Sequence, residues 1–142
     1  MIYKLMDFSI PHKLDMDALV KVLSENDSVV FAYIYGSVLA ENGANDIDIA
    51  VFAETDSDPN QLSAELKVSL HNETGLSPDV FDVRILNAVG EHGDLFGLLY
   101  LKRVLEDGKI LVDKDPGDRA DFLEHYGFRF RECEGLIQEV LA

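Results

Sequence analysis

Two aspartates stand one residue apart at the start of an apolar run. Asp46 and Asp48 open the segment DIDIAVF, residues 46–52. Successive side chains of a strand point to opposite faces, so this alternation predicts a strand with both carboxylates on one face, about 7 Å apart. Two like charges held this close raise the cost of ionising each other unless a cation lies between them. Carboxylate oxygens are hard ligands, so the pair indicates a Mg²⁺ site.

A third carboxylate is expected from a later strand. Residues 79–86, DVFDVRIL, favour a strand in which apolar side chains partly alternate with polar ones. Asp82 is expected to face Asp46 and Asp48, whereas Asp79 falls on the apolar parity and is the weaker candidate for a third ligand. Three converging carboxylates can hold two metal ions, one lowering the pKa of an attacking hydroxyl and one steadying a leaving pyrophosphate.

A glycine and a serine precede the first aspartate. Gly36 and Ser37 follow the run VVFAYIY, residues 29–35, whose β-branched and aromatic side chains predict a buried strand. Glycine permits a turn and the close approach of a phosphate, and the serine hydroxyl and amide are donors for its oxygens. Taken alone, each motif is more often an ordinary turn or an exposed strand edge. In this order, strand, Gly-Ser, loop, Asp-x-Asp, strand, they predict a site for metal ions and a nucleotide triphosphate.

Other patterns predict the elements that position these motifs. The length of 142 residues fits one domain. Apolar spacing and capping residues predict helices over about 15–23, 58–75 and 94–106, a short edge strand at 109–112, and a long amphipathic helix after Pro116. A hairpin-like loop should place the strand at 46–52 beside the strand at 29–35.

The acidic composition limits the partners that the chain can bind. With 27 acidic and 12 basic residues, the net charge is −15, which repels a long nucleic acid. A nucleotide could still bind through divalent cations. No apolar run approaches the roughly 20 residues of a membrane-spanning helix, and residues 1–11 show no secretory pattern, so a cytoplasmic protein is expected. The single cysteine, Cys133, is expected to be a reduced core residue.

The order of the motifs resembles that of the minimal nucleotidyltransferases (MNT), a prokaryotic group in the nucleotidyltransferase superfamily with a DNA polymerase β type of palm. The family signature of Gly-Ser, a short loop and Asp-x-Asp is matched by GS at 36–37 and DID at 46–48, and FDVRILNA at 81–88 looks like its third acidic strand. The resemblance covers about residues 29–126. It implies an α+β fold in a single domain, residues 1–142, with a mixed sheet, helices mainly on one face and a long C-terminal helix.

The resemblance also implies the roles of individual residues and a partner. It gives metal-ligand and catalytic roles to Asp46, Asp48 and Asp82, and phosphate-binding roles to Gly36 and Ser37. Family members of this size commonly act as antitoxins of HEPN-type toxins, and some transfer AMP from ATP to a tyrosine of that partner. The expected activity is therefore magnesium-dependent adenylylation of a protein hydroxyl, with Asp82 placed to help deprotonate it.

Two other functions stay open. The loop between Ser37 and Asp46 holds eight residues, VLAENGAN, with no arginine, whereas the family often has arginines there and a longer loop. A catalytically weak or inactive antitoxin that acts only by binding would tolerate these changes. Transfer to a small hydroxylated compound is the other alternative, although no separate substrate-binding domain is evident. The aromatic stripe of the last helix is either core or a surface for a partner or a homo-oligomer.

Overall fold

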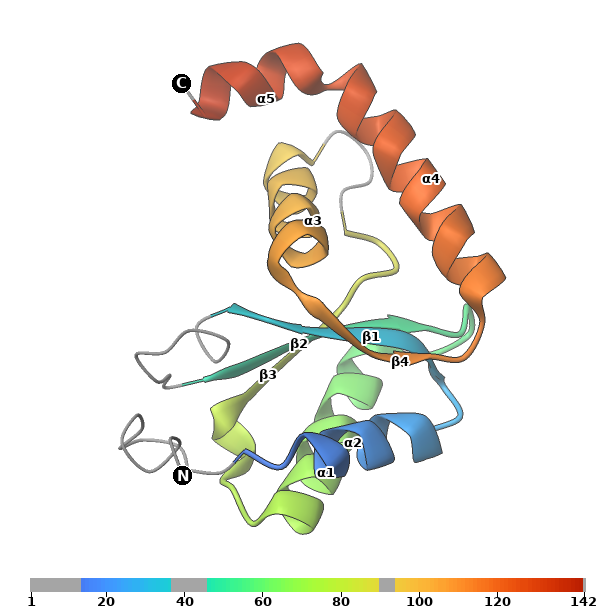
Figure 1. The fold of residues 1–142 in the computed structure, drawn as a ribbon, viewed down its shortest axis with the longest axis vertical. Coiled ribbons are helices and arrows are strands. Elements are labelled where there is room, and N and C mark those ends of the chain that lie inside the picture. The colour runs from blue at the N-terminus through green and yellow to red at the C-terminus, as the bar shows by residue number, and fades with distance from the viewer. Residues whose placement is uncertain (1–13, 37–45, 90–93, 142) are drawn as a thin grey trace.

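The computed structural model describes residues 14–36, 46–89 and 94–141, which form a four-stranded sheet between two layers of helices (Figure 1). The elements in chain order are α1 (Met16–Glu25), β1 (Val29–Tyr35), β2 (Ile47–Ala53), α2 (Pro59–Thr74), the 3₁₀ helix η3 (Pro78–Val80), β3 (Phe81–Ile85), α3 (Leu95–Asp107), β4 (Lys109–Asp113), α4 (Pro116–Glu132) and α5 (Glu134–Leu141).

The sheet is mixed, with the strand order β3-β2-β1-β4. β1 pairs antiparallel with both β2 and β4, and β2 pairs parallel with β3. The predicted neighbours, β1 and β2, are therefore confirmed, as is the short edge strand, β4. Because the connection from β2 to a parallel neighbour must cross over, α2 fills that role.

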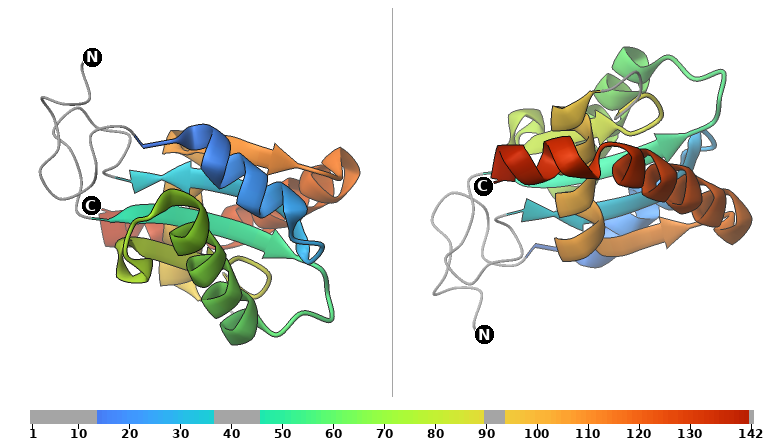
Figure 2. Two further views of the ribbon diagram at one scale, coloured as in Figure 1. Left: turned by 90° about the horizontal axis from the view of Figure 1, so that it is seen from below. Right: turned by 90° about the horizontal axis from the view of Figure 1, so that it is seen from above.

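Both faces of the sheet are covered by helices (Figures 1 and 2). One face packs against α1 and α2, whose buried residues include Leu19, Leu23, Leu62, Leu66 and Leu70. The other face packs against α3 and α4, through Leu101, Val104, Phe122 and Tyr126. The expectation that helices lie mainly on one face is therefore wrong. All seven residues of β1 are buried, and a strand that is apolar on both faces needs cover on both.

The helix boundaries follow from capping residues. Side-chain oxygens of Asp15, Asp58 and Asp94 accept backbone N–H groups at the starts of α1, α2 and α3. Gly75 ends α2 in the left-handed region, with φ of 79°. The predicted bounds of these three helices are confirmed within a few residues. None of the helices in the described ranges is long and apolar enough to cross a membrane.

The predicted long C-terminal helix is two helices. α4 ends at Glu132, its C-cap Cys133 has φ of −104° and ψ of 5°, outside the helical region, and α5 continues in a new direction (Figure 1). Gly135 favours this break because glycine has a low helix propensity. α5 then contacts α3, and Ile137 is fully buried. Cys133 is a free, half-buried thiol at the junction, so its prediction as a core residue is also wrong.

Candidate active site

Asp48 lies at the centre of the candidate site, near the start of β2. The strand register pairs Asp48 with Tyr35 of β1 on one side and with Asp82 of β3 on the other. Neighbouring strands lie about 5 Å apart, so the two carboxylates are adjacent on the face that α3 covers. Asp46 is exposed and lies one residue before β2. The register therefore brings Asp48 and Asp82 side by side, with Asp46 at the strand's entrance.

The charges of the three carboxylates act on one another. Partial burial raises the pKa of Asp48, and the negative charges of Asp82 and Asp46 raise it further, while Arg103 and Arg84 oppose the shift. A cation would relieve this repulsion, and an all-oxygen donor set suits Mg²⁺. In the described ranges, however, no three His, Cys, Asp or Glu side chains are grouped closely enough to hold one metal ion. The joint metal-binding role of the three aspartates stays a prediction.

Gly36 leaves space for the Asp48 carboxylate. Its φ of 84° lies in the left-handed region, which glycine adopts without steric cost. A Cβ atom at this position would overlap Oδ2 of Asp48. Any other residue at position 36 would therefore strain the backbone and displace the carboxylate. Ser37 and residues 38–45 lie outside the described residues, so the phosphate-binding role predicted for Ser37 also stays a prediction.

Helix α3 forms the wall of the site above the strands. The hydroxyls of Tyr100 and Tyr35 lie 2.8 Å apart and share a hydrogen bond, and their rings meet edge to face. Burial raises the pKa of both tyrosines, so both hydroxyls stay protonated at neutral pH. The guanidinium of Arg84 lies 5.1 Å from the centre of the Tyr100 ring, and its Nε lies 3.6 Å from Oδ2 of Asp82. Two tyrosines and an arginine thus surround the paired carboxylates.

The sequence pattern alone did not identify the contribution of α3. Tyr100 and Arg103 lie three residues apart and so share a face of the helix. Periodicity shows which residues of a helix lie together, but it does not show which end of the sheet that helix covers. The alternation that placed Asp82 on the carboxylate face also places Arg84, two residues later, on that face.

Asp79 lies outside the strand that carries Asp82. It belongs to η3, where its backbone N–H donates to Oγ of Ser77 at 3.3 Å. β3 begins only at Phe81, two residues later than the start of the predicted strand. Asp79 is therefore not aligned with the paired carboxylates by the strand register.

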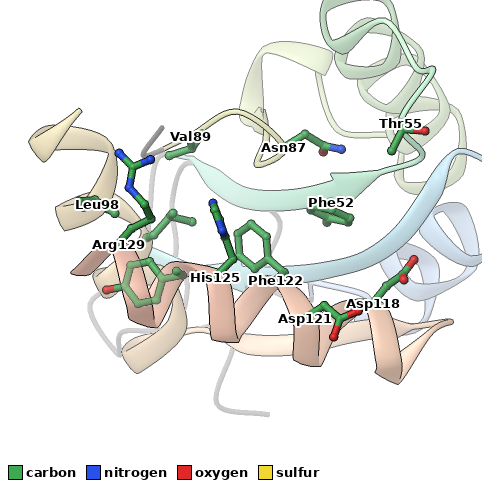
Figure 3. A pocket seen from close by; sticks show the side chains of 12 residues that line it. Phe52, Thr55, Asn87, Val89, Leu98, Asp118, Asp121, Phe122, His125 and Arg129 are labelled. Carbon is green, nitrogen blue, oxygen red and sulfur yellow. The ribbon is translucent and has the colours of Figure 1, made fainter. Parts of the chain in front are cut away.

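A cavity of about 330 Å³ opens on the same face of the sheet, between α3 and α4 (Figure 3). It is lined by Phe52, Val89 and Leu98, with Phe122, His125 and Arg129 of α4. Phe52 lies four residues after Asp48, roughly 13 Å along the strand. Leu98 and Tyr100 lie about 200° apart around α3. The cavity is therefore separate from the carboxylates.

The fold and the carboxylate pair define the class of protein: a nucleotidyltransferase palm. The family model described as "Polymerase beta, Nucleotidyltransferase" matches residues 17–117, which include every described candidate residue. The chain therefore belongs to the polymerase β nucleotidyltransferase family. None of the curated proteins compared with the sequence matches it significantly.

Solved structures with a similar fold come from toxin–antitoxin complexes. A toxin–antitoxin complex with AMP-PNP is 24% identical, with a TM-score of 0.62 over 91% of this chain and 100% of that chain. An MntA–HepT complex is 23% identical, with a TM-score of 0.55 over 89% and 97%. A complex of tri-AMPylated Shewanella oneidensis HEPN toxin with MNT antitoxin is 23% identical, with a TM-score of 0.57 over 89% and 96%. At these identities the likeness confirms the predicted polymerase-β-like α+β fold.

Proposed function

We propose that this chain is an antitoxin that transfers AMP from ATP to a tyrosine hydroxyl of a HEPN-type toxin. The observation that carries the proposal is the pairing of Asp48 with Asp82 beside Gly36, within a nucleotidyltransferase palm. The nucleotide and the partner are carried over from similar structures, one with AMP-PNP and one with an AMPylated HEPN toxin.

Magnesium ions held by Asp46, Asp48 and Asp82 would offset the negative charge of the triphosphate and of the leaving pyrophosphate. The donor set fits this role, because the three side chains offer only hard carboxylate oxygens and the pKa of Asp48 is raised by its acidic neighbours. Gly36 leaves room for the Asp48 carboxylate beside the bend. Gly36 and Ser37 are the residues expected to bind the phosphate.

The acceptor enters from the β3 side of Asp48, where Asp82 lies. Its oxygen attacks the α-phosphorus, the bond from that phosphorus to the bridging oxygen breaks, and pyrophosphate leaves. Asp82 takes the proton of the acceptor hydroxyl, because its side chain is 45% exposed and lies next to Asp48 in the strand register. The product is a phosphodiester between AMP and the acceptor.

A second function is inhibition of the partner by binding alone. One observation favours it: residues 38–45 contain no lysine or arginine and include Glu41, so this loop offers no positive charge to a triphosphate. Transfer to a small compound is the third alternative, and label on such a compound rather than on a protein would support it.

Labelled ATP separates these functions. The parent chain is incubated with Mg²⁺, ATP labelled on its α-phosphate, and the purified product of the neighbouring gene. Transfer predicts label on that protein with the parent chain and none with Asp48→Asn or with EDTA. Inhibition of the activity of that protein, without any label on it, supports the binding-only function. Equal labelling by the parent and by Asp48→Asn would show that the catalytic assignment is wrong.

A further inference from the structure

One face of α3 continues from the carboxylates to an exposed phenylalanine. Phe96, Tyr100 and Arg103 are spaced at i, i+4 and i+7, which places them within an arc of about 60°. The contacts of Tyr100 with Tyr35 and Arg84 show that this face looks onto the candidate site. The three residues therefore form one strip, here called the α3 strip.

Phe96 is the most exposed large apolar side chain in the described ranges, at 79%. A single exposed apolar residue is ordinary on a protein surface. Phe96 differs in its position, because it lies only about 6 Å along the helix axis from Tyr100, whose hydroxyl bonds the strand residue paired with Asp48. An apolar side chain is thus presented to solvent at the margin of the site.

We propose that the α3 strip is the docking surface for the protein acceptor, with Phe96 as its apolar anchor. The proposal rests on the proposed function. A polypeptide that presents a hydroxyl to Asp82 must lie against the wall of the site, and α3 is that wall. Aromatic residues that become buried on association contribute most of the binding energy in many protein interfaces.

Charge specifies the acceptor further. The chain carries a net charge of −15, yet the α3 strip includes the exposed Arg103, and the guanidinium of Arg84 packs over Tyr100 of the same strip. The part of the acceptor that faces Arg103 should therefore offer oxygen acceptors, carboxylates included, rather than lysine or arginine. Next to them it should offer an apolar pocket for the Phe96 ring.

Binding of the neighbouring gene product, measured by calorimetry without nucleotide, tests the surface. Phe96→Ala should weaken binding by at least about tenfold, because truncating a buried aromatic anchor has an effect of this size. Phe128→Ala is the matched control: Phe128 is 55% exposed, lies on α4 and is not part of the α3 strip. Its binding should stay within about twofold of the parent. Both variants should keep the rise in melting temperature that ATP and Mg²⁺ cause in the parent.

Transfer kinetics give a second readout. Phe96→Ala should raise the KM for the protein acceptor and leave kcat at saturating acceptor unchanged, because Phe96 does not contact the reacting atoms. Parent-like binding by Phe96→Ala, or equal losses in Phe96→Ala and Phe128→Ala, overturns the docking surface. If the parent binds the acceptor but never labels it, the transfer function is overturned. The binding affinities of the parent, Phe96→Ala and Phe128→Ala still test the docking surface in that case.

Discussion

The two faces of the sheet differ in composition although the same strands form both. Toward α1 and α2, the strands present Ile34, Ile49 and Val83, which pack against the leucines of both helices in one continuous core. Toward α3, neighbouring positions present carboxylates, tyrosine hydroxyls and an arginine, and a cavity lies beyond the helix. A strand that alternates between faces can therefore stabilise the fold with one face and carry polar chemistry on the other.

The polar face contains a repulsion that the apolar face does not. The raised pKa of Asp48 means that the folded chain disfavours its charged form. Such a cost is tolerated at a site when the rest of the core is well packed, so that the fold keeps enough stability. Substitutions on the two faces should accordingly separate effects on activity from effects on stability.

The largest expected effect is the loss of transfer in Asp48→Asn. Transfer should fall well over a hundredfold, because even groups that only orient a metal ligand are worth about 10- to 100-fold. Radiolabel transfer at saturating ATP measures this. Asp79→Asn is the control, since Asp79 lies in η3 away from the strand register, and its rate should stay close to that of the parent. Comparable losses in both variants would contradict the importance of the Asp48–Asp82 pair.

The same Asp48→Asn variant should not lose stability at pH 7. The carboxyl pKa of Asp48 is raised above its ordinary value of 3.8, so its contribution to stability is fully present below that value and is lost as pH rises through the raised pKa. Relative to the Asn variant, the parent should become less stable between about pH 4 and pH 7. Urea unfolding in EDTA at both pH values measures this difference in stability. If the parent instead became more stable relative to the variant as the pH rises, the direction given for the pKa of Asp48 would be wrong.

Leucine truncations on the two sides of the sheet should differ in cost. Leu66→Ala removes a fully buried side chain from the closed face, and the free energy of unfolding should fall by about 3 to 4 kcal/mol. Leu98→Ala removes a leucine that is equally buried but lines the cavity, so fewer contacts are lost and about 2 kcal/mol is expected. Urea denaturation measures both. Equal costs would mean that the two faces are packed equally well.

Two glycines test the space beside Asp48. Gly36 and Gly75 both have positive φ, so alanine should cost each about 1 kcal/mol of stability. Only Gly36→Ala also pushes a Cβ into the Asp48 carboxylate, whereas the space around Gly75 is open. Transfer should therefore fall about tenfold or more in Gly36→Ala and stay unchanged in Gly75→Ala, because a displaced reacting group costs one to two orders of magnitude. Thermal melting and radiolabel transfer measure the two effects.

Local signals in the sequence predicted the helices and the core of the candidate site. Asp58 followed by proline and Gly75 define α2 because capping depends on a few adjacent residues. Alternation placed Asp48 and Asp82 on one face because the side-chain period of a strand is two. The order of the motifs then predicted the family, which the match over residues 17–117 confirms.

Features that depend on packing between distant segments were missed. Nothing local shows that α3 covers the carboxylates, so Tyr100 and its bond to Tyr35 could not be predicted. Gly135 is a local signal for the break after α4, but the packing of α5 against α3 joins distant segments and could not be predicted from it. The second helical layer was predictable, because VVFAYIY shows no alternation and a strand apolar on both faces needs two covers. The expectation that helices lie mainly on one face did not take this lack of alternation into account.

The smallest effect concerns the hydroxyl pair that joins α3 to β1. Tyr35→Phe or Tyr100→Phe alone leaves a partly buried hydroxyl without its partner, so each should lower the free energy of unfolding by about 1 kcal/mol. The double substitution removes both hydroxyls, and its cost should be clearly less than the sum, with a coupling of roughly 0.5 to 1.5 kcal/mol. Urea unfolding of the four proteins measures this cycle. Additive costs would show that the hydroxyls do not hold the wall of the site to the sheet, and packing of the rings alone would then position α3 over the carboxylates.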